Sequence, residues 1–297
     1  METNQKVAFF DIDGTVMNNH LPALLIKYFF ENYEYRGNYA KKLEKQKNEL
    51  EFARKRYKNY YSRAFNLLKE EWRVENYSDA FGEYSQMFYP LMATLFEGYS
   101  EEEVSKIASE VLHEYRYEAY AYSLELINKL RSEDFQLIAI SGSPQFLVDA
   151  FVKEFGFAQG IGGGFELKNG FWQEVDGKVT WCQKDKIARE MLGDDFFKKP
   201  NIIVAVGDTL GDVELLNLAQ AKIIINAQYD LYQEISENSD FVSVISRKDS
   251  ILIESNWFKF ACVDQGGSKV TSEYKRFRKG EDLEDHFSNG FWQKILV

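Results

Sequence analysis

The feature that most constrains this chain is a repeated junction, in which a short apolar run is followed directly by small polar or acidic residues. Val7–Phe10 leads into Asp11, and residues 136–140 and 201–206 lead into comparable polar loops. Short, continuous apolar runs are typical of strands buried on both faces of a parallel sheet. Ligands bind at the carboxyl ends of such strands. The repeated junction therefore predicts a parallel sheet that collects polar residues along one edge.

Two further apolar runs, residues 222–226 and 241–244, continue this series of strands. The segments between the runs have helical periodicity, over Ser123–Arg131, Gln145–Phe155, Lys184–Leu192 and Val213–Ala219. Strands that alternate with helices indicate a sheet covered by helices on both faces. The predicted fold class is therefore α/β, with a Rossmann-like parallel sheet as its core.

Residues 18–122 differ from the rest, because their apolar residues recur at helical spacing of three and four. The pattern is clearest in one long amphipathic segment, at Tyr39, Leu43, Leu50, Ala53, Tyr57, Ala64 and Leu67. We therefore predict three parts: a core of residues 1–17 plus 123–246, an inserted all-helical cap domain of residues 18–122, and a C-terminal extension of residues 247–297. The role of the extension is not predicted.

Two segments of the predicted core contain turn signals. Residues 165–181 contain Asn169-Gly170 and Asp176-Gly177, dipeptides that favour a β-hairpin. The glycine-rich stretch 160–164 leads into that hairpin rather than into a helix, so it is not a dinucleotide-binding loop. We predict a flexible connection between strands there.

Charge and composition exclude several classes of partner. The chain has 36 Lys and Arg against 47 Asp and Glu, a net charge of -11, which disfavours sequence-independent binding to nucleic acid. The two cysteines are far apart, which disfavours a zinc site or a disulfide framework and favours a cytoplasmic protein. No apolar stretch approaches the roughly 20 residues of a membrane span, and no signal peptide is expected.

Four carboxylates follow predicted strands. Asp11 and Asp13 are two residues apart at one strand end, and Asp208 and Asp212 follow another. Paired carboxylates disfavour each other unless a cation or a proton compensates. An oxygen-only site of this kind suits Mg²⁺ better than zinc. The alternative is that these Asp residues are ordinary turn and helix-cap residues, which explains either pair alone better than it explains both.

Two other polar features accompany the carboxylates. Ser141 and Gly142 follow the strand 136–140, where a hydroxyl and backbone N–H groups can bind a phosphoryl oxygen. Lys184 opens a predicted helix and can neutralise a carboxylate or a phosphate. Taken singly, Ser141 is better explained as a helix cap and Lys184 as a solvated surface residue.

Together these pieces resemble the haloacid dehalogenase (HAD) superfamily of phosphohydrolases. Its first motif corresponds to residues 9–15, its second to residues 138–142, its lysine to Lys184 and its fourth motif to residues 206–212. The resemblance covers about 1–17 and 123–246. All four parts occur in the family's order, and the four-part signal is specific although each part alone is weak.

The resemblance implies a role for each residue. Asp11 would attack phosphorus and form an aspartyl-phosphate, while Asp13 would act as general acid and then as general base. Ser141 and Gly142 would bind the phosphoryl group, and Lys184 would offset its charge. The Mg²⁺ ion would be held by Asp11, the backbone carbonyl of Asp13 and Asp208, with Asp212 supporting. Covalent catalysis divides the hydrolysis into two easier steps.

The helical insert and the hairpin 165–181 resemble the phosphoserine-phosphatase-like subfamily, whose cap selects the substrate. Phosphoserine phosphatases carry a glutamate at the position of His20, where it contacts the substrate amine. His20 is therefore a candidate substrate-binding residue here, and its identity argues against phosphoserine. The expected activity is Mg²⁺-dependent hydrolysis of a small-molecule phosphate ester. Two alternatives remain: a phosphotransferase that uses an acceptor alcohol, or a non-catalytic binding protein on the same fold.

Overall fold

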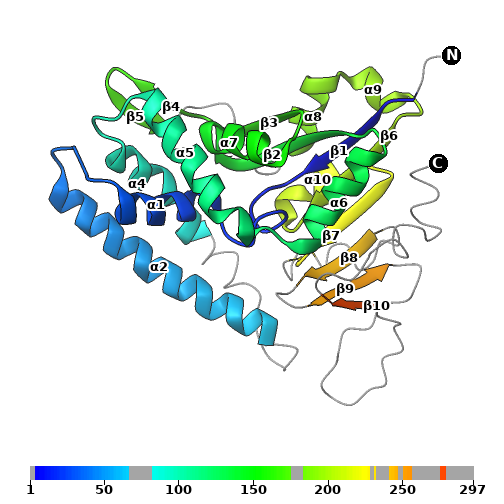
Figure 1. Ribbon diagram of the computed structural model, residues 1–297, viewed down its shortest axis with the longest axis horizontal. Helices are drawn as coiled ribbons and strands as arrows, with labels where there is room; N and C mark the ends of the chain where they lie inside the picture. Colours follow the sequence, from blue (N-terminus) through cyan, green and yellow to red (C-terminus); the bar gives the residue numbers. More distant parts are fainter. Residues whose placement is uncertain are drawn as a thin grey trace.

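The computed structural model describes residues 4–66, 82–174, 183–227, 231, 241–246, 250–255 and 275–278. Its centre is one large sheet (Figure 1), formed by β1 (Lys6–Phe10), β2 (Gln136–Pro144), β3 (Gln159–Gly163), β6 (Ile202–Gly207), β7 (Ala221–Ile225), β8 (Phe241–Ser246), β9 (Ser250–Ser255) and β10 (Lys275–Arg278). The strand order is β10-β9-β8-β7-β6-β1-β2-β3. The strands from β8 to β3 are parallel, while β9 and β10 are antiparallel to their neighbours. The predicted Rossmann-like α/β core is confirmed.

Strand β1 lies inside this sheet, paired in parallel with β2 on one side and with β6 on the other. Its residues Val7 to Phe10 are buried, as a continuous apolar strand in a parallel sheet should be. The backbone N–H of Asp11 still donates to the carbonyl of Val206, at 2.9 Å. The carboxyl ends of β1, β2 and β6 are therefore neighbours, which brings the three predicted polar junctions to one edge.

Helices cover both faces of the sheet because successive side chains of a strand point to opposite faces. Ala8 and Phe10 belong to a hydrophobic cluster that includes α6 (Ala121–Ser132) and α7 (Gln145–Phe155). Val7 and Phe9 belong to a second cluster, on the face covered by α8 (Lys184–Leu192), α9 (Asp194–Lys198) and α10 (Val213–Leu216). The last of these helices is shorter than the predicted 213–219.

In the described part of residues 18–122, the regular elements are helices, which include α1 (Leu21–Asn32), α2 (Ala40–Asn66), α4 (Phe88–Leu95), α5 (Glu101–Tyr115) and the short 3-10 helix η1 (Arg116–Glu118). Figure 1 shows these elements beside one end of the sheet, with α2 along the outside. Helix α5 packs against α7 and shares the first hydrophobic cluster with it. Within the described ranges, no helix combines the length and the hydrophobicity needed to cross a membrane.

A separate two-stranded hairpin, β4 (Phe165–Lys168) with β5 (Phe171–Glu174), packs against α4 of the helical insert. Asn169 and Gly170 both have positive φ, 54° and 81°, the requirement of a two-residue hairpin turn. The indole N–H of Trp172 donates to the carbonyl of Tyr99 at 3.0 Å, just before α5. The predicted hairpin is confirmed as far as residue 174, and its second turn signal at 176–177 lies outside the described residues.

Two predicted loops are instead parts of strands. The polar residues 141–144 belong to β2, although the register with β3 shifts between Ile140 and Pro144. The glycine-rich stretch 160–164 is not a flexible connection, because residues 159–163 form the edge strand β3. Glycine is required there by packing: a Cβ at Gly160 would lie 2.6 Å from Val148 Cγ1 of α7.

Part of the predicted C-terminal extension joins the central sheet. Strand β9 pairs with β8, and β10 pairs with β9, so both continue the sheet beyond residue 246. The structure thus places these two segments of residues 247–297 against the core. The three-part division of the chain remains a prediction.

Candidate active site

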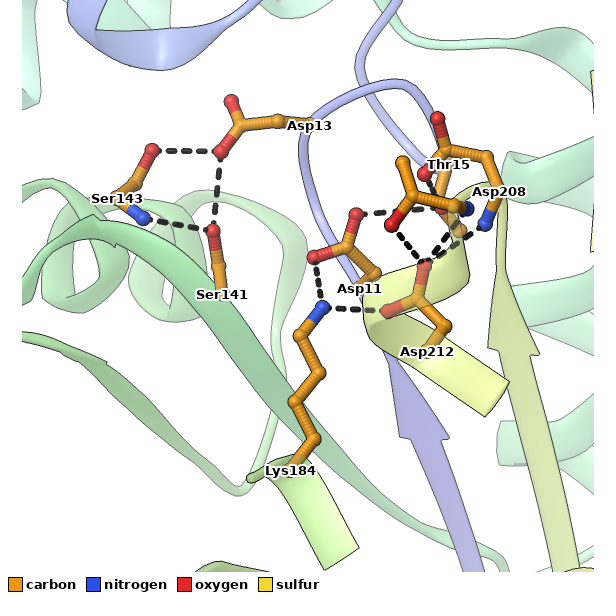
Figure 2. Close-up of polar contacts among 9 residues, drawn as sticks. Asp11, Asp13, Thr15, Ser141, Ser143, Lys184, Asp208 and Asp212 are labelled. Atoms are coloured by element: carbon orange, nitrogen blue, oxygen red, sulfur yellow. Dashed lines mark hydrogen bonds and ion pairs between the residues drawn. The ribbon is translucent and has the colours of Figure 1, made fainter. Parts of the chain in front are cut away.

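A buried lysine joins two of the predicted carboxylates at the carboxyl edge of the sheet (Figure 2). Lys184 Nζ lies 2.6 Å from Asp11 Oδ1 and 2.6 Å from Asp212 Oδ1. Asp11 follows β1, Lys184 begins α8, and Asp212 follows β6, so three separate segments meet here. Lys184 is only 5% exposed, and it is therefore not a solvated surface residue. Charge-assisted hydrogen bonds of this kind are short and strong.

Asp212 also organises the loop that follows β6. Its Oδ2 accepts hydrogen bonds from the backbone N–H groups of Asp208 (3.1 Å) and Thr209 (2.9 Å), and from Thr209 Oγ1 (3.0 Å). This loop packs tightly, because a Cβ at Gly207 would lie 2.5 Å from Asp212 Cβ. Asp212 thus holds both the backbone of the loop at Asp208 and the ammonium group of Lys184.

Asp208 is held from the opposite side by the turn after β1. Thr15 Oγ1 donates to Asp208 Oδ1 at 2.9 Å and lies 3.4 Å from Asp11 Oδ2. The turn requires glycine at position 14, where φ is 87° and a Cβ would lie 2.2 Å from Asp208 Oδ2. Thr15 and Gly14 therefore bring Asp208 close to Asp11.

The site carries more negative than positive charge. Burial raises the pKa of Asp11 to about 7, and the charges of Asp212 and Asp13 add to this, although Lys184 opposes it. Burial also raises the pKa of Asp208 well above its usual value, and the charges of Asp11 and Asp212 raise it further. Burial alone would lower the pKa of Lys184, but its two carboxylate partners outweigh burial and raise it. Burial thus raises the pKa values of the two carboxyl groups, and the neighbouring carboxylates raise the pKa values of all three groups.

These residues fit a hard divalent cation. Asp11, Asp208 and Asp212 each offer one carboxylate oxygen, and these oxygens lie within 4.8 Å of one another. One lysine cannot balance three buried carboxylates, and oxygen-only donor sets suit Mg²⁺. The site can therefore hold the predicted Mg²⁺ ion.

The charge balance predicts how Mg²⁺ and Asp208 affect stability. Mg²⁺ should raise the unfolding temperature of the wild type. Asp208→Asn should stabilise the metal-free protein by about 1–2 kcal/mol, because it removes a buried charge while an amide oxygen can still accept from Thr15. The same variant should no longer respond to Mg²⁺. Thermal unfolding with Mg²⁺ and with chelator tests this, with the exposed Asp194→Asn as control; an unchanged Mg²⁺ response in Asp208→Asn would contradict it.

Asp13 occupies a second position, on the side of β2 (Figure 2). Its Oδ2 accepts from Ser141 Oγ at 3.0 Å and from Ser143 Oγ at 2.6 Å. Its Oδ1 accepts from the backbone N–H of Leu21, the first residue of α1, at 2.6 Å. Asp13 is thus tied both to the end of β2 and to the start of the helical insert.

The two remaining predicted site residues lie near this second position. The carbonyl of Gly142 accepts from Tyr89 Oη of α4 at 2.9 Å. The ring of His20 packs with Tyr84 (6.1 Å between ring centroids) and Phe88 (6.2 Å). Burial lowers the pKa of His20, although the charge of Asp13 opposes this. His20 therefore borders the side of the site that faces the insert.

Two residues of this site, Thr15 and Ser143, were not predicted from the sequence. Thr15 is the last residue of the first motif, so the motif was the signal that could have identified it. Ser143 is two residues from Ser141, the spacing of side chains on one face of a strand. That signal was hidden because residues 141–144 were predicted as a loop.

A family model for haloacid dehalogenase-like hydrolases matches residues 8–217. The chain belongs to this family. The match includes β1, β2, β6 and α8, which carry the carboxylates, the serines and the lysine. Membership in the haloacid dehalogenase-like family confirms the predicted superfamily and makes the chain a hydrolase, and it supports phosphatase activity. Because the match runs continuously through residues 18–122, it does not test the predicted domain boundaries.

Several solved structures match this chain at low sequence identity, and the first of those below, with a TM-score above 0.5, has a similar fold. A Bordetella pertussis protein of unknown function has a TM-score of 0.56 and 13% identity, with 82% of this chain and 99% of that chain covered. A phospho-aspartyl intermediate analogue of phosphoserine phosphatase has a TM-score of 0.43 and 16% identity, covering 78% and 91%. A phosphoserine phosphohydrolase-like protein from Francisella tularensis has a TM-score of 0.45 and 13% identity, covering 80% and 94%. No curated protein sequence matches this chain.

Proposed function

We propose that this protein is a Mg²⁺-dependent phosphatase that hydrolyses a small-molecule phosphate monoester through an aspartyl-phosphate on Asp11. The observation that carries the proposal is the buried Asp11–Lys184–Asp212 arrangement at the carboxyl edge of the sheet. It presents a carboxylate beside a fixed positive charge, while the nearby carboxylates fit a cation. Phosphoryl transfer depends mainly on such positioning and charge neutralisation.

In the first step, a carboxylate oxygen of Asp11 forms a bond to phosphorus as the bond to the leaving alcohol breaks. Asp13 gives its proton to the leaving oxygen. Ser141 and the backbone of Gly142 bind phosphoryl oxygens, and Lys184 offsets their charge. In the second step, Asp13 takes a proton from water, which attacks phosphorus and releases phosphate. Asp11 is then regenerated.

Mg²⁺, held by Asp11, the backbone carbonyl of Asp13 and Asp208 with Asp212 supporting, would supply further neutralisation of the phosphoryl oxygens. Covalent catalysis of this kind replaces one difficult displacement by two easier ones. The helical insert supports substrate selection by a cap, because α1 and α4 both donate hydrogen bonds into the second part of the site.

The test is phosphate release from an aryl phosphate, measured with Mg²⁺ and with chelator. We expect turnover only with Mg²⁺. Adding an acceptor alcohol distinguishes hydrolysis from phosphotransfer, because transfer would yield a new phosphate ester. The proposal fails if there is no turnover and if beryllofluoride, a mimic of the phosphoryl group, does not bind in the presence of Mg²⁺.

His20 predicts the substrate preference. A glutamate at this position would provide an ionic partner for a substrate amine, whereas the His20 ring packs with Tyr84 and Phe88. We expect phosphoserine to be hydrolysed no better than a matched phosphate ester that lacks the amine. His20→Glu should raise kcat/KM for phosphoserine relative to that ester by about tenfold, the effect of one charged contact. An unchanged ratio would show that position 20 does not contact this part of the substrate.

A further inference from the structure

Three hydrogen-bond donors from two separate segments hold the carboxylate of Asp13. Ser143 Oγ makes the shorter of the two serine contacts, at 2.6 Å, and Ser141 Oγ the longer, at 3.0 Å. The third donor, the backbone N–H of Leu21, binds the other carboxylate oxygen at 2.6 Å. Figure 2 shows Asp13 turned toward the serines and away from the Asp11–Lys184 pair. The orientation of the Asp13 side chain is therefore set by the two serines and the start of α1 rather than by Asp11.

The end of β2 is shaped to present both serines to Asp13. Residues 141 and 143 share one face of the strand, and both side chains are buried. The register shift between Ile140 and Pro144 separates this segment from β3. The amide of Gln145 fills the resulting gap, because its Nε2 donates to Gly160 O at 3.1 Å and its Oε1 accepts from Gly162 N at 2.7 Å. Strand irregularities of this kind direct side chains toward functional sites.

The two serines are not equivalent. Ser141 Oγ also accepts from the backbone N–H of Ser143 at 3.0 Å, and in the proposed function Ser141 binds a phosphoryl oxygen. When the substrate occupies Ser141, the Ser143 hydroxyl is the serine contact that remains for Asp13. A hydroxyl can both donate and accept, so Ser143 can keep this contact whether or not Asp13 holds a proton.

We propose that Ser143 is the positioning residue that orients Asp13 for proton transfer to the leaving alcohol. This inference rests on the proposed function. In the step concerned, the bond between phosphorus and the leaving oxygen breaks, and that oxygen receives the proton of Asp13. Ser143 exchanges no proton with the substrate. Loss of the Ser143 hydroxyl should therefore lower kcat/KM most for esters whose leaving oxygen must be protonated.

A series of phosphate esters with different leaving groups tests this. Ser143→Ala should lower kcat/KM by about 10- to 100-fold for an alkyl phosphate, whose leaving oxygen must be protonated. For the ester of a strongly acidic phenol, which leaves as its anion, the loss should be less than about threefold. The value kcat/KM is used because it reports the step that forms the aspartyl-phosphate. Ser143→Thr, which keeps the hydroxyl, should recover kcat/KM for the alkyl phosphate more than for the ester of the acidic phenol.

Two comparisons separate positioning from a general structural effect. Ser243→Ala makes the same change at a buried position on the distant strand β8 and should not alter the leaving-group dependence. In an Asp13→Ala background, adding Ser143→Ala should change kcat/KM by less than about twofold, because residues that act through one another are not additive.

The outcomes distinguish the two proposals. An equal loss for all esters, or full additivity with Asp13→Ala, would overturn the role of Ser143 and leave the phosphatase proposal standing. Absence of turnover by the wild type with every ester would overturn the proposed function, and the role of Ser143 with it.

Discussion

Asp11→Asn should lower the rate of phosphate release on the order of 10⁴-fold or more without unfolding the protein. Asparagine has nearly the same shape as aspartate, and its carbonyl oxygen can still accept a hydrogen bond from Lys184. It cannot, however, provide a carboxylate nucleophile. The variant should therefore bind substrate and fail to form the aspartyl-phosphate. Phosphate release, together with mass spectrometry of protein quenched in acid during turnover, measures both effects.

The matched control for this variant is Asp195→Asn, an exposed aspartate of α9 whose only described partner is Lys198. Its activity should equal that of the wild type. The unfolding temperature of Asp11→Asn, measured without metal, should not fall, because the change removes a buried negative charge from a site that has too many. Substantial turnover by Asp11→Asn would exclude Asp11 as the nucleophile.

Lys184→Met should cause the largest loss of stability of any change at this site, about 3–5 kcal/mol without Mg²⁺. Lys184 contacts Asp11 and Asp212 in a buried setting, so its removal leaves carboxylates without their protein counter-charge. Mg²⁺ should recover part of this loss, because it supplies positive charge to the same oxygens. Activity should be lost even with Mg²⁺. Denaturant unfolding with Mg²⁺ and with chelator measures the stability.

Lys186→Met is the control for Lys184→Met, since Lys186 lies on the same helix and is exposed. It should change the free energy of unfolding by less than about 0.5 kcal/mol. Lys184→Arg keeps the charge and should recover stability better than activity, because a guanidinium does not reproduce the compact geometry of an ammonium. A free energy of unfolding for Lys184→Met within about 1 kcal/mol of the wild type would show that the buried pair is not needed for stability.

The site residues that directly follow buried strands could be recognised in the sequence. Parallel strands buried on both faces are apolar throughout, so the change to polar residues after Phe10 and Val206 marked their ends directly. The convergence of Asp11 and Asp208 could then be predicted from topology, because neighbouring parallel strands end at one edge. Lys184, which begins α8 rather than following a strand, was assigned to the site only by the family resemblance. The roles of these residues remain predictions until the variants are measured.

The missed features depend on tertiary contacts. Strand β3 is rich in glycine because α7 packs closely on it, so it lacks the β-branched residues that identify a strand. The contribution of Ser143 depends on a register shift in β2, which no local pattern indicates. The strands β9 and β10 pair antiparallel with the sheet, outside the alternation of strands and helices that identified the others.

The position of β1 has a consequence for how the chain is made. Val7 pairs with Gln136 on one side and with Ile203 on the other, so both neighbours of this strand come much later in the chain. During synthesis on the ribosome, β1 therefore stays unpaired until β2 and β6 have been made, while the intervening helices emerge and can fold locally. Loss of the pairing with β6 would leave one edge of β1 open to other chains. Truncation products that end before residue 203 are therefore expected to aggregate rather than accumulate as soluble fragments.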